Sequence, residues 1–242
     1  GGRKENQDNL MIDSRLDEIS SGSKGFYCEG IMSVENEKRY FVVCDGMGGR
    51  SNGAEASQIA IKSFRDNLQE LKIKGSPVDI MKLLIELNDK IIHYFQINEK
   101  RGGTTISIVQ VNKDETIEVF NIGDSPVMLM RDGNIKLISE EQSVAGMKLK
   151  CGRISEKEYE HSNEKNLLLG YLGDFTTKSL KNTFYSGKIK YQQGDVILVS
   201  SDGLIGAINK QRLNDMISFG VSAKELLEEG KKKKNSDNIT VI

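Results

Sequence analysis

Two strand-like stretches of this chain each lead into an Asp-Gly pair, and this pattern constrains the fold more than any other feature. Residues 40–44 are apolar and are followed by Asp45-Gly46 and a glycine-rich turn. Far downstream, residues 195–201 lead in the same way to Asp202-Gly203. Such a strand delivers one aspartate to its tip, next to a backbone that can fold tightly around a ligand. Asp-Gly is also a common turn dipeptide, but two such endings favour carboxylates that converge on one hard cation.

Length and composition describe a chain with a substantial core. It has 242 residues, of which 37% are hydrophobic and 29% are charged, enough for one large domain or two small ones. The net charge of −1 gives no reason to expect nucleic acid or a membrane as a partner. No apolar run has membrane-spanning length and no signal peptide opens the sequence. We therefore expect a cytoplasmic protein.

The residue types available for metal binding point to oxygen ligands. The three cysteines, Cys28, Cys44 and Cys151, are widely spaced, and we expect reduced thiols. The two histidines are His93 and His161, and His93 lies in an amphipathic helical pattern that predicts a helix-surface or packing residue rather than a catalytic one. A metal site here should hold magnesium or manganese rather than zinc.

The spacing of apolar residues predicts many strands joined by short turns, and short turns join antiparallel neighbours. The expected strands cover residues 9–12, 26–34, 39–44, 104–111, 116–122, 127–130, 135–138, 183–190, 195–200 and 239–242. The expected helices cover residues 53–71, 77–94, 155–161, 210–219 and 223–229, with Ser76 as the N-cap of the second. We expect one domain over residues 1–242, sheets inside and helices outside, with a polar flap at about 139–175.

Five aspartates lie at the ends of these strands: Asp8, Asp45, Asp124, Asp202 and Asp237. Several carboxylates without His or Cys form a hard oxygen cage. Two divalent ions bridged by a carboxylate are a common device for displacement at phosphorus, with a shared water as the nucleophile. Arg3 precedes this group, and its guanidinium could bind two phosphate oxygens in a fork.

Six short motifs then follow one another in a recognisable order. They occupy residues 3–8, 43–49, 102–105, 121–125, 201–204 and 236–240. Each is weak alone, but in this order they resemble the PP2C (PPM) family of metal-dependent serine/threonine protein phosphatases along essentially the whole chain. Residues 152–155 with His161 also resemble the flap of bacterial members.

The resemblance implies an α+β fold, a four-layer α-β-β-α sandwich of two antiparallel sheets flanked by helices. It implies hydrolysis of phosphoserine and phosphothreonine in proteins, with two Mn²⁺ or Mg²⁺ ions and a third, weaker ion in bacterial members. The expected partners are phosphorylated proteins and a Ser/Thr kinase that shares these targets, and we expect a monomer.

The resemblance also assigns roles to individual residues. Asp45 would bridge the two ions, and Gly46 would offer its carbonyl oxygen to one of them. Asp202 and Asp237 would hold the other ion. Asp8 would hold metal-bound waters.

The remaining assignments include three departures from the family pattern. Arg3 would bind the substrate phosphate, and Asp124 would help to bind the third ion. Gln7 stands where many members have Glu, which predicts a weaker metal site. Met47 replaces the His of animal members, so it cannot serve as a general acid, and Gly206 replaces an Asp of the third site. The family usually has a strand before its arginine motif, so we expect that strand outside this sequence or a different sheet edge.

Three other interpretations are open to test. Residues 49–53 match G-x-S-x-G, but the intervening turn, the strand order and the absence of any histidine after His161 argue against a nucleophile elbow. Insensitivity to serine-directed inhibitors with loss of activity on chelation would separate the two. A catalytically weak module that only binds phosphoproteins would lack the metal aspartates, and Gln7 alone favours it. Nucleotide binding is disfavoured because both glycine-rich fingerprints fail.

Overall fold

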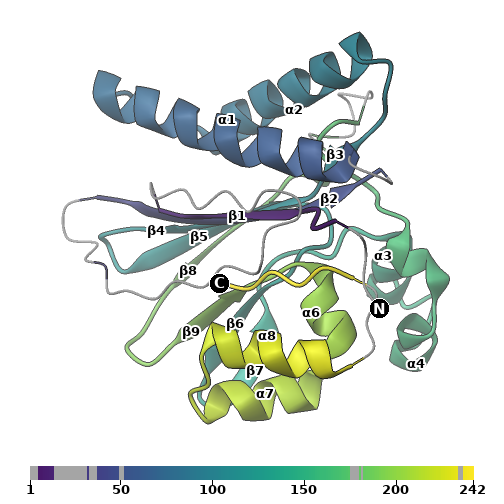
Figure 1. Ribbon diagram of the computed structural model, residues 1–242. Coiled ribbons are helices and arrows are strands. Elements are labelled where there is room, and N and C mark those ends of the chain that lie inside the picture. The colour runs from purple at the N-terminus through teal and green to yellow at the C-terminus, as the bar shows by residue number, and fades with distance from the viewer. Residues whose placement is uncertain are drawn as a thin grey trace.

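The computed structural model describes residues 5–13, 32, 37–48, 52–174, 180, 182–233 and 237–242. Within these ranges, two antiparallel sheets lie between two groups of helices (Figure 1). None of the helices in these ranges is both long and apolar enough to cross a membrane.

The larger sheet has the strand order β1-β2-β4-β5-β8, and β3 pairs with β2 beside this path. Its strands are β1 (Asp8–Ile12), β2 (Arg39–Met47), β3 (Gly103–Thr104), β4 (Ile106–Val111), β5 (Thr116–Ile122) and β8 (Tyr185–Lys190). The smaller sheet has the order β7-β6-β9. Its strands are β6 (Val127–Arg131), β7 (Asn134–Leu137) and β9 (Val196–Val199).

The helices for which the structure gives both ends form two covering layers and a third group beside the sheets. The larger sheet is covered by α1 (Asn52–Lys74) and α2 (Ile80–Ile97), and the smaller sheet by α6 (Asp202–Ala207), α7 (Lys210–Ser218) and α8 (Ala223–Lys232) (Figure 1). A third group, α3 (Val144–Lys150), α4 (Glu156–Glu160) and the 3₁₀ turn η1 (Asn163–Asn166), lies beside one end of the sheets.

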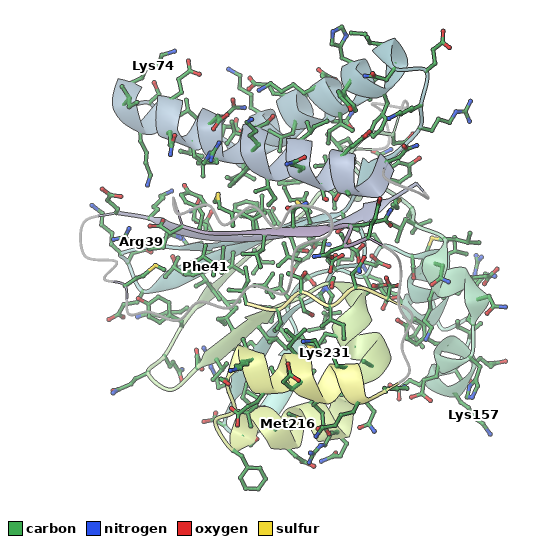
Figure 2. The ribbon with its side chains drawn as sticks, in the orientation of Figure 1. Arg39, Phe41, Lys74, Lys157, Met216 and Lys231 are labelled. Carbon is green, nitrogen blue, oxygen red and sulfur yellow. The ribbon has the colours of Figure 1, made fainter. Side chains whose placement is uncertain are left out.

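Three apolar clusters hold these layers together. Alternation along β2 sends Val42 toward α1 and α2, and Val43 into the space between the sheets. In α1, Ala56, Ala60 and Phe64 recur at helical spacing and are buried. A third cluster lies between the smaller sheet and α6–α8. Figure 2 shows Phe41 among the layers, whereas the side chains of Lys74 and Lys157 reach outward. The four-layer α+β arrangement expected from the sequence is confirmed.

Several local predictions were wrong. β2 continues through Asp45 to Met47 because Gly46 and Met47 pair with β3. The N-cap of α2 is Asp79, whose carboxylate accepts a hydrogen bond from the amide of Lys82 at 3.0 Å, and not Ser76.

Other differences concern whole elements. The helices α3 and α6 were not predicted. Residues 239–242 contribute one isolated bridge, Ser200 to Val241, in place of a regular strand. The predicted strand 26–34 lies outside the described residues except for Met32.

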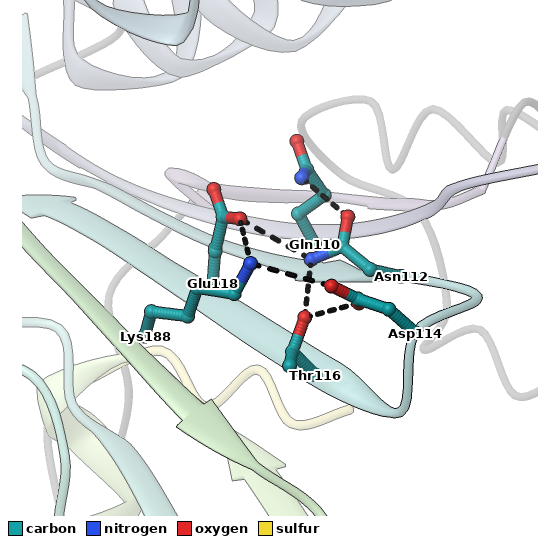
Figure 3. Close-up of polar contacts among 6 residues, drawn as sticks. All are labelled: Gln110, Asn112, Asp114, Thr116, Glu118 and Lys188. Carbon is teal, nitrogen blue, oxygen red and sulfur yellow. Dashed lines mark hydrogen bonds and ion pairs between the residues drawn. The ribbon is translucent and has the colours of Figure 1, made fainter.

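The turn between β4 and β5, at the end of the larger sheet away from Asp45, carries a polar network (Figure 3). Gln110 donates to Asn112 at 2.7 Å, and Asn112 donates to Thr116 at 3.1 Å. Lys188 of β8 lies 3.4 Å from both Asp114 and Glu118. Its donors and acceptors satisfy one another, so this network explains the hairpin without a ligand.

Candidate active site

The centre of the candidate site is the pairing of β1 with β2. Asp8 and Asp45 are directly opposed in the antiparallel register, so their side chains share one face of the sheet. The amide of Gly46 donates to the carbonyl of Gln7 at 3.1 Å and closes the end of this ladder.

Asp8 is held by two hydroxyl groups. Its Oδ2 accepts hydrogen bonds from Ser201 Oγ and Thr240 Oγ1, both at 2.8 Å. Its Oδ1 is buried and has no hydrogen-bond partner. Burial raises the pKa of Asp8 to about 6, although the two hydroxyls lower it, and the charges of Asp202 and Asp237 raise it further. Asp8 therefore presents one fixed oxygen and one oxygen with unused acceptor capacity.

Asp45 is positioned through its backbone. Its amide donates to Thr105 Oγ1 at 3.0 Å, and its carbonyl accepts from Thr104 Oγ1 at 2.9 Å. Burial, followed by the charges of Asp8 and Asp202, raises the pKa of Asp45 well above its usual value. The carboxylates thus repel one another at this end of the sheet.

Asp124 lies in the turn between β5 and β6. Gly123 has φ of 107°, a conformation that favours glycine, and its amide donates to Gln142 Oε1 at 2.7 Å. Burial and then the charge of Asp202 raise the pKa of Asp124 to about 8. The turn thereby brings Asp124 within electrostatic range of the other aspartates.

Asp202 and Asp237 come from two segments in close backbone contact. Asp202 occupies the first turn of α6. A Cβ on Gly203 would lie 1.8 Å from the carbonyl oxygen of Asn238, so only glycine permits this approach. Asn238 Oδ1 also accepts from the amide of Gln7 at 3.0 Å and ties the C-terminal segment to β1.

A comparable close approach joins β2 to the start of α1. A Cβ on Gly46 would lie 2.1 Å from the carbonyl oxygen of Gly53. This contact explains glycine at both positions. The same contact places the first turn of α1 against the end of β2, directly after Asp45.

Strand register places Asp8 opposite Asp45, and hydrogen bonds join Asp8 to Ser201 and Thr240, which lie next to Asp202 and close to Asp237. The charges of Asp202 and Asp124 also act on Asp45, so the five aspartates lie near one another at one rim. Gln7 is buried beside them. Arg3 lies outside the described residues. Sequence reasoning gave no role to the hydroxyls of Ser201 and Thr240, although each stands in one of the six motifs and next to, or close to, an aspartate.

The donor set has hard oxygen chemistry. In the described ranges, no three Asp, Glu, His or Cys side chains form a ready-made cage. Magnesium usually binds one or two carboxylates and keeps several waters, so a cage of protein side chains is not required. Crowded carboxylates with raised pKa values and a buried acceptor without a partner fit a dication better than a neutral ligand.

Two antiparallel sheets lie between helical layers, and one rim carries the buried Asp8 with the half-buried Asp45, Asp124, Asp202 and Asp237. This arrangement fits a metal-dependent phosphatase better than a nucleotide-binding protein. The model of the protein phosphatase 2C family matches residues 27–235. The chain belongs to this family, whose members are serine/threonine protein phosphatases.

Individual relatives agree with this placement. The serine/threonine phosphatase stp of Listeria welshimeri is 27% identical over 223 residues, which cover 88% of this chain and 86% of the relative. The solved serine/threonine phosphatase of S. agalactiae has a TM-score of 0.78 at 21% identity and covers 100% of this chain and 93% of its own. The catalytic domain of the phosphatase PstP, solved with two manganese ions, has a TM-score of 0.68 at 21% identity, with 97% and 95% covered.

Proposed function

We propose that this chain hydrolyses phosphoserine and phosphothreonine in proteins with the help of two Mn²⁺ or Mg²⁺ ions held by the aspartate rim. The observation that carries the proposal is the unpartnered buried oxygen of Asp8 among carboxylates with raised pKa values. One oxygen of Asp8 is buried without a partner, and the surrounding carboxylates raise one another's pKa. Bound cations would relieve this repulsion. The relative solved with two manganese ions supports the choice of metal.

In this proposal Asp45 and the carbonyl of Gly46 would hold the metal ions together with Asp202 and Asp237. The contact of Gly203 with Asn238 would set how far Asp202 lies from Asp237. When bound, the ions activate water and stabilise the charge that develops on the phosphoryl oxygens.

Asp8 would act on the water rather than on the phosphate. Ser201 and Thr240 fix its Oδ2, which leaves Oδ1 to orient a water and to accept its proton. The absence of a side chain that could donate a proton at Met47 leaves protonation of the leaving group to water. Arg3 would bind the phosphate of the substrate, and Asp124 with Gln7 would contribute to a weaker third site.

The proposal extends to partners and compartment. We infer that the substrates are proteins phosphorylated by a Ser/Thr kinase and that the enzyme acts as a cytoplasmic monomer. Cys44 and Cys151, the described cysteines, are free thiols, which agrees with a reducing compartment. A module that only binds phosphoproteins has less support, because Asp45, Asp202 and Asp237, the three aspartates proposed to hold the two ions, are all present in the sequence.

The test measures metal binding and turnover separately. Protein stripped of metal with a chelator should bind added Mn²⁺, which electron paramagnetic resonance detects. The Mn²⁺-loaded protein should then hydrolyse p-nitrophenyl phosphate and phosphoserine or phosphothreonine peptides. Asp45→Asn and Asp202→Asn should lower both Mn²⁺ binding and turnover. Intact peptides after Mn²⁺ has bound would reject the enzymatic proposal and favour the binding module.

A further inference from the structure

Two buried hydroxyl groups join the strand that carries Asp45 to the turn that carries Asp124. The amide of Asp45 donates a hydrogen bond to Thr105 Oγ1 at 3.0 Å. Thr105 Oγ1 lies 2.7 Å from Ser125 Oγ, so one of these hydroxyls donates to the other. Ser125 directly follows Asp124 in the chain. Two hydrogen bonds in series therefore connect the backbone of Asp45 with the neighbour of Asp124.

A further hydrogen bond holds the same turn against β4. Ser107 Oγ donates to the carbonyl of Ser125 at 2.6 Å. Thr105, Ser107 and Ser125 are each at most 1% exposed. Bulk water cannot replace a bond that is lost at such a depth, so each of these hydroxyls matters more than an exposed one would.

The hydrocarbon part of Thr105 supports the other side of this turn. A Cβ built on Gly123 would lie 2.7 Å from Cγ2 and 2.8 Å from Cβ of Thr105, so only glycine permits this approach. Both neighbours of Asp124, Gly123 and Ser125, thus touch the same threonine. Thr105 therefore sets the position of Asp124 from both sides.

The two aspartates that this contact joins repel each other. Burial and then the charges of neighbouring carboxylates, Asp124 among them, raise the pKa of Asp45. Like charges at close range would move apart if nothing held them. The contacts from Thr105 to Ser125 and Gly123 oppose this separation.

We propose that Thr105 and Ser125 are positioning residues for metal binding, because their hydroxyl pair sets the separation of the Asp45 and Asp124 carboxylates. Both carboxylates can then bind the same group of Mn²⁺ ions. The part that concerns metal rests on the proposed function, whereas the part that concerns the turn rests only on the contacts above. The two hydroxyls take part in no chemical step.

Two substitutions of Thr105 separate the effect of its hydroxyl from that of its shape. Thr105→Val keeps the branched side chain and removes the hydroxyl, whereas Thr105→Ser keeps the hydroxyl and removes the methyl group. In calorimetry on protein stripped of metal, Thr105→Val should lower Mn²⁺ affinity about three- to tenfold, as expected for one net hydrogen bond. Thr105→Ser should lower it less than about twofold. Equal losses in the two variants would overturn the proposal.

A second set of variants tests whether Ser125 acts through Asp124. Ser125→Ala should lower Mn²⁺ affinity about three- to tenfold. In an Asp124→Ala background it should have no further effect, because the carboxylate that it positions is gone. Ser200→Ala is the matched control, since Ser200 is fully buried and its hydroxyl has no hydrogen-bond partner among the described residues. It should leave the affinity unchanged. A further loss from Ser125→Ala in the Asp124→Ala background would reject a role through Asp124.

Hydrogen exchange gives a readout that needs neither metal nor activity. In metal-free Thr105→Val, the amide of Asp45 should exchange about tenfold faster, because it loses its acceptor. In metal-free Ser125→Ala, the amide of Gly123 should also exchange faster, while amides of α1 keep their rates. Unchanged exchange at both amides would overturn the proposal. If the unaltered protein binds no Mn²⁺, the proposed function fails, and the exchange rates still decide whether the hydroxyl pair fixes the turn.

Discussion

Asp8 and Asp45 are direct partners across the β1–β2 ladder. Like charges in opposed positions destabilise a sheet, and this pair is also crowded by Asp202, whose charge raises the pKa of both. The satisfied network around Asn112 shows how the same sheet arranges polar groups where no ligand is needed (Figure 3). The aspartate rim differs from this network because its carboxylates repel one another, and a bound cation would offset that repulsion.

Asp45→Asn tests this difference in two opposite directions. Removing one charge should lower turnover by about a hundredfold or more, because the proposed metal site would lose one of its few carboxylate ligands. The metal-free variant should gain on the order of 0.5–1 kcal/mol in free energy of unfolding, because an opposed like-charge pair is gone. Asp89→Asn, an exposed change on α2, is the matched control and should alter neither quantity. Near-normal turnover in Asp45→Asn would defeat the site assignment.

The raised pKa values predict an unusual dependence of stability on pH in the presence of chelator. Asp8 and Asp124 have folded pKa values of about 6 and about 8, above the usual 3.8, so the folded state binds more protons than the unfolded state. The stabilising contribution of these two carboxyl groups is therefore complete at low pH, and it is lost as the pH rises through their folded pKa values. The free energy of unfolding, measured with urea, should be about 2–4 kcal/mol lower at pH 8 than at pH 5. This range is already reduced to allow for the partial exposure of Asp124. Saturating Mn²⁺ should make the free energy of unfolding depend less on pH. Metal-free protein that is more stable at pH 8 than at pH 5 would contradict the prediction.

The sequence predicted the acidic residues better than their arrangement. Asp45 and Asp202 stand out because apolar strands precede them and glycine follows. The opposition of Asp8 to Asp45 depends on strand register, which long-range pairing sets. For the same reason the hydroxyls of Ser201 and Thr240 could be read only as neighbours of aspartates, since their bonds to Asp8 join residues far apart in the chain.

The sequence mispredicted the start of a helix where two local capping signals competed. Ser76 and Pro77 form a familiar helix start, yet Asp79 also has capping chemistry and its bond to Lys82 decides the boundary. The short helix α6 contains Gly203 and Gly206, which lower helix propensity. Its position is fixed instead by tertiary contact with Asn238.

Thr240→Val tests the hydroxyl contact with Asp8. The change removes one of two donors to a buried carboxylate, which should cost about 1–3 kcal/mol in free energy of unfolding. It should also lower kcat about tenfold with KM nearly constant, because Asp8 loses its fixed orientation. Thr116→Val removes a threonine hydroxyl from the distant hairpin network and is the matched control (Figure 3). It should lower stability without an effect on kcat. Equal kcat losses in the two variants would show that Thr240 acts through stability alone.

Gly203→Ala tests whether close backbone packing sets the geometry of Asp202 and Asp237. The added Cβ would meet the carbonyl oxygen of Asn238 at 1.8 Å, so the two segments must separate. We expect Mn²⁺ affinity to fall about tenfold or more, because ligands that move apart no longer share an ion. Gly133→Ala, which has open space around it and φ of 73°, is the comparison. It should cost about 1 kcal/mol of stability through backbone strain and leave Mn²⁺ affinity unchanged by calorimetry. Wild-type affinity in Gly203→Ala would mean that the two aspartates do not bind a common metal.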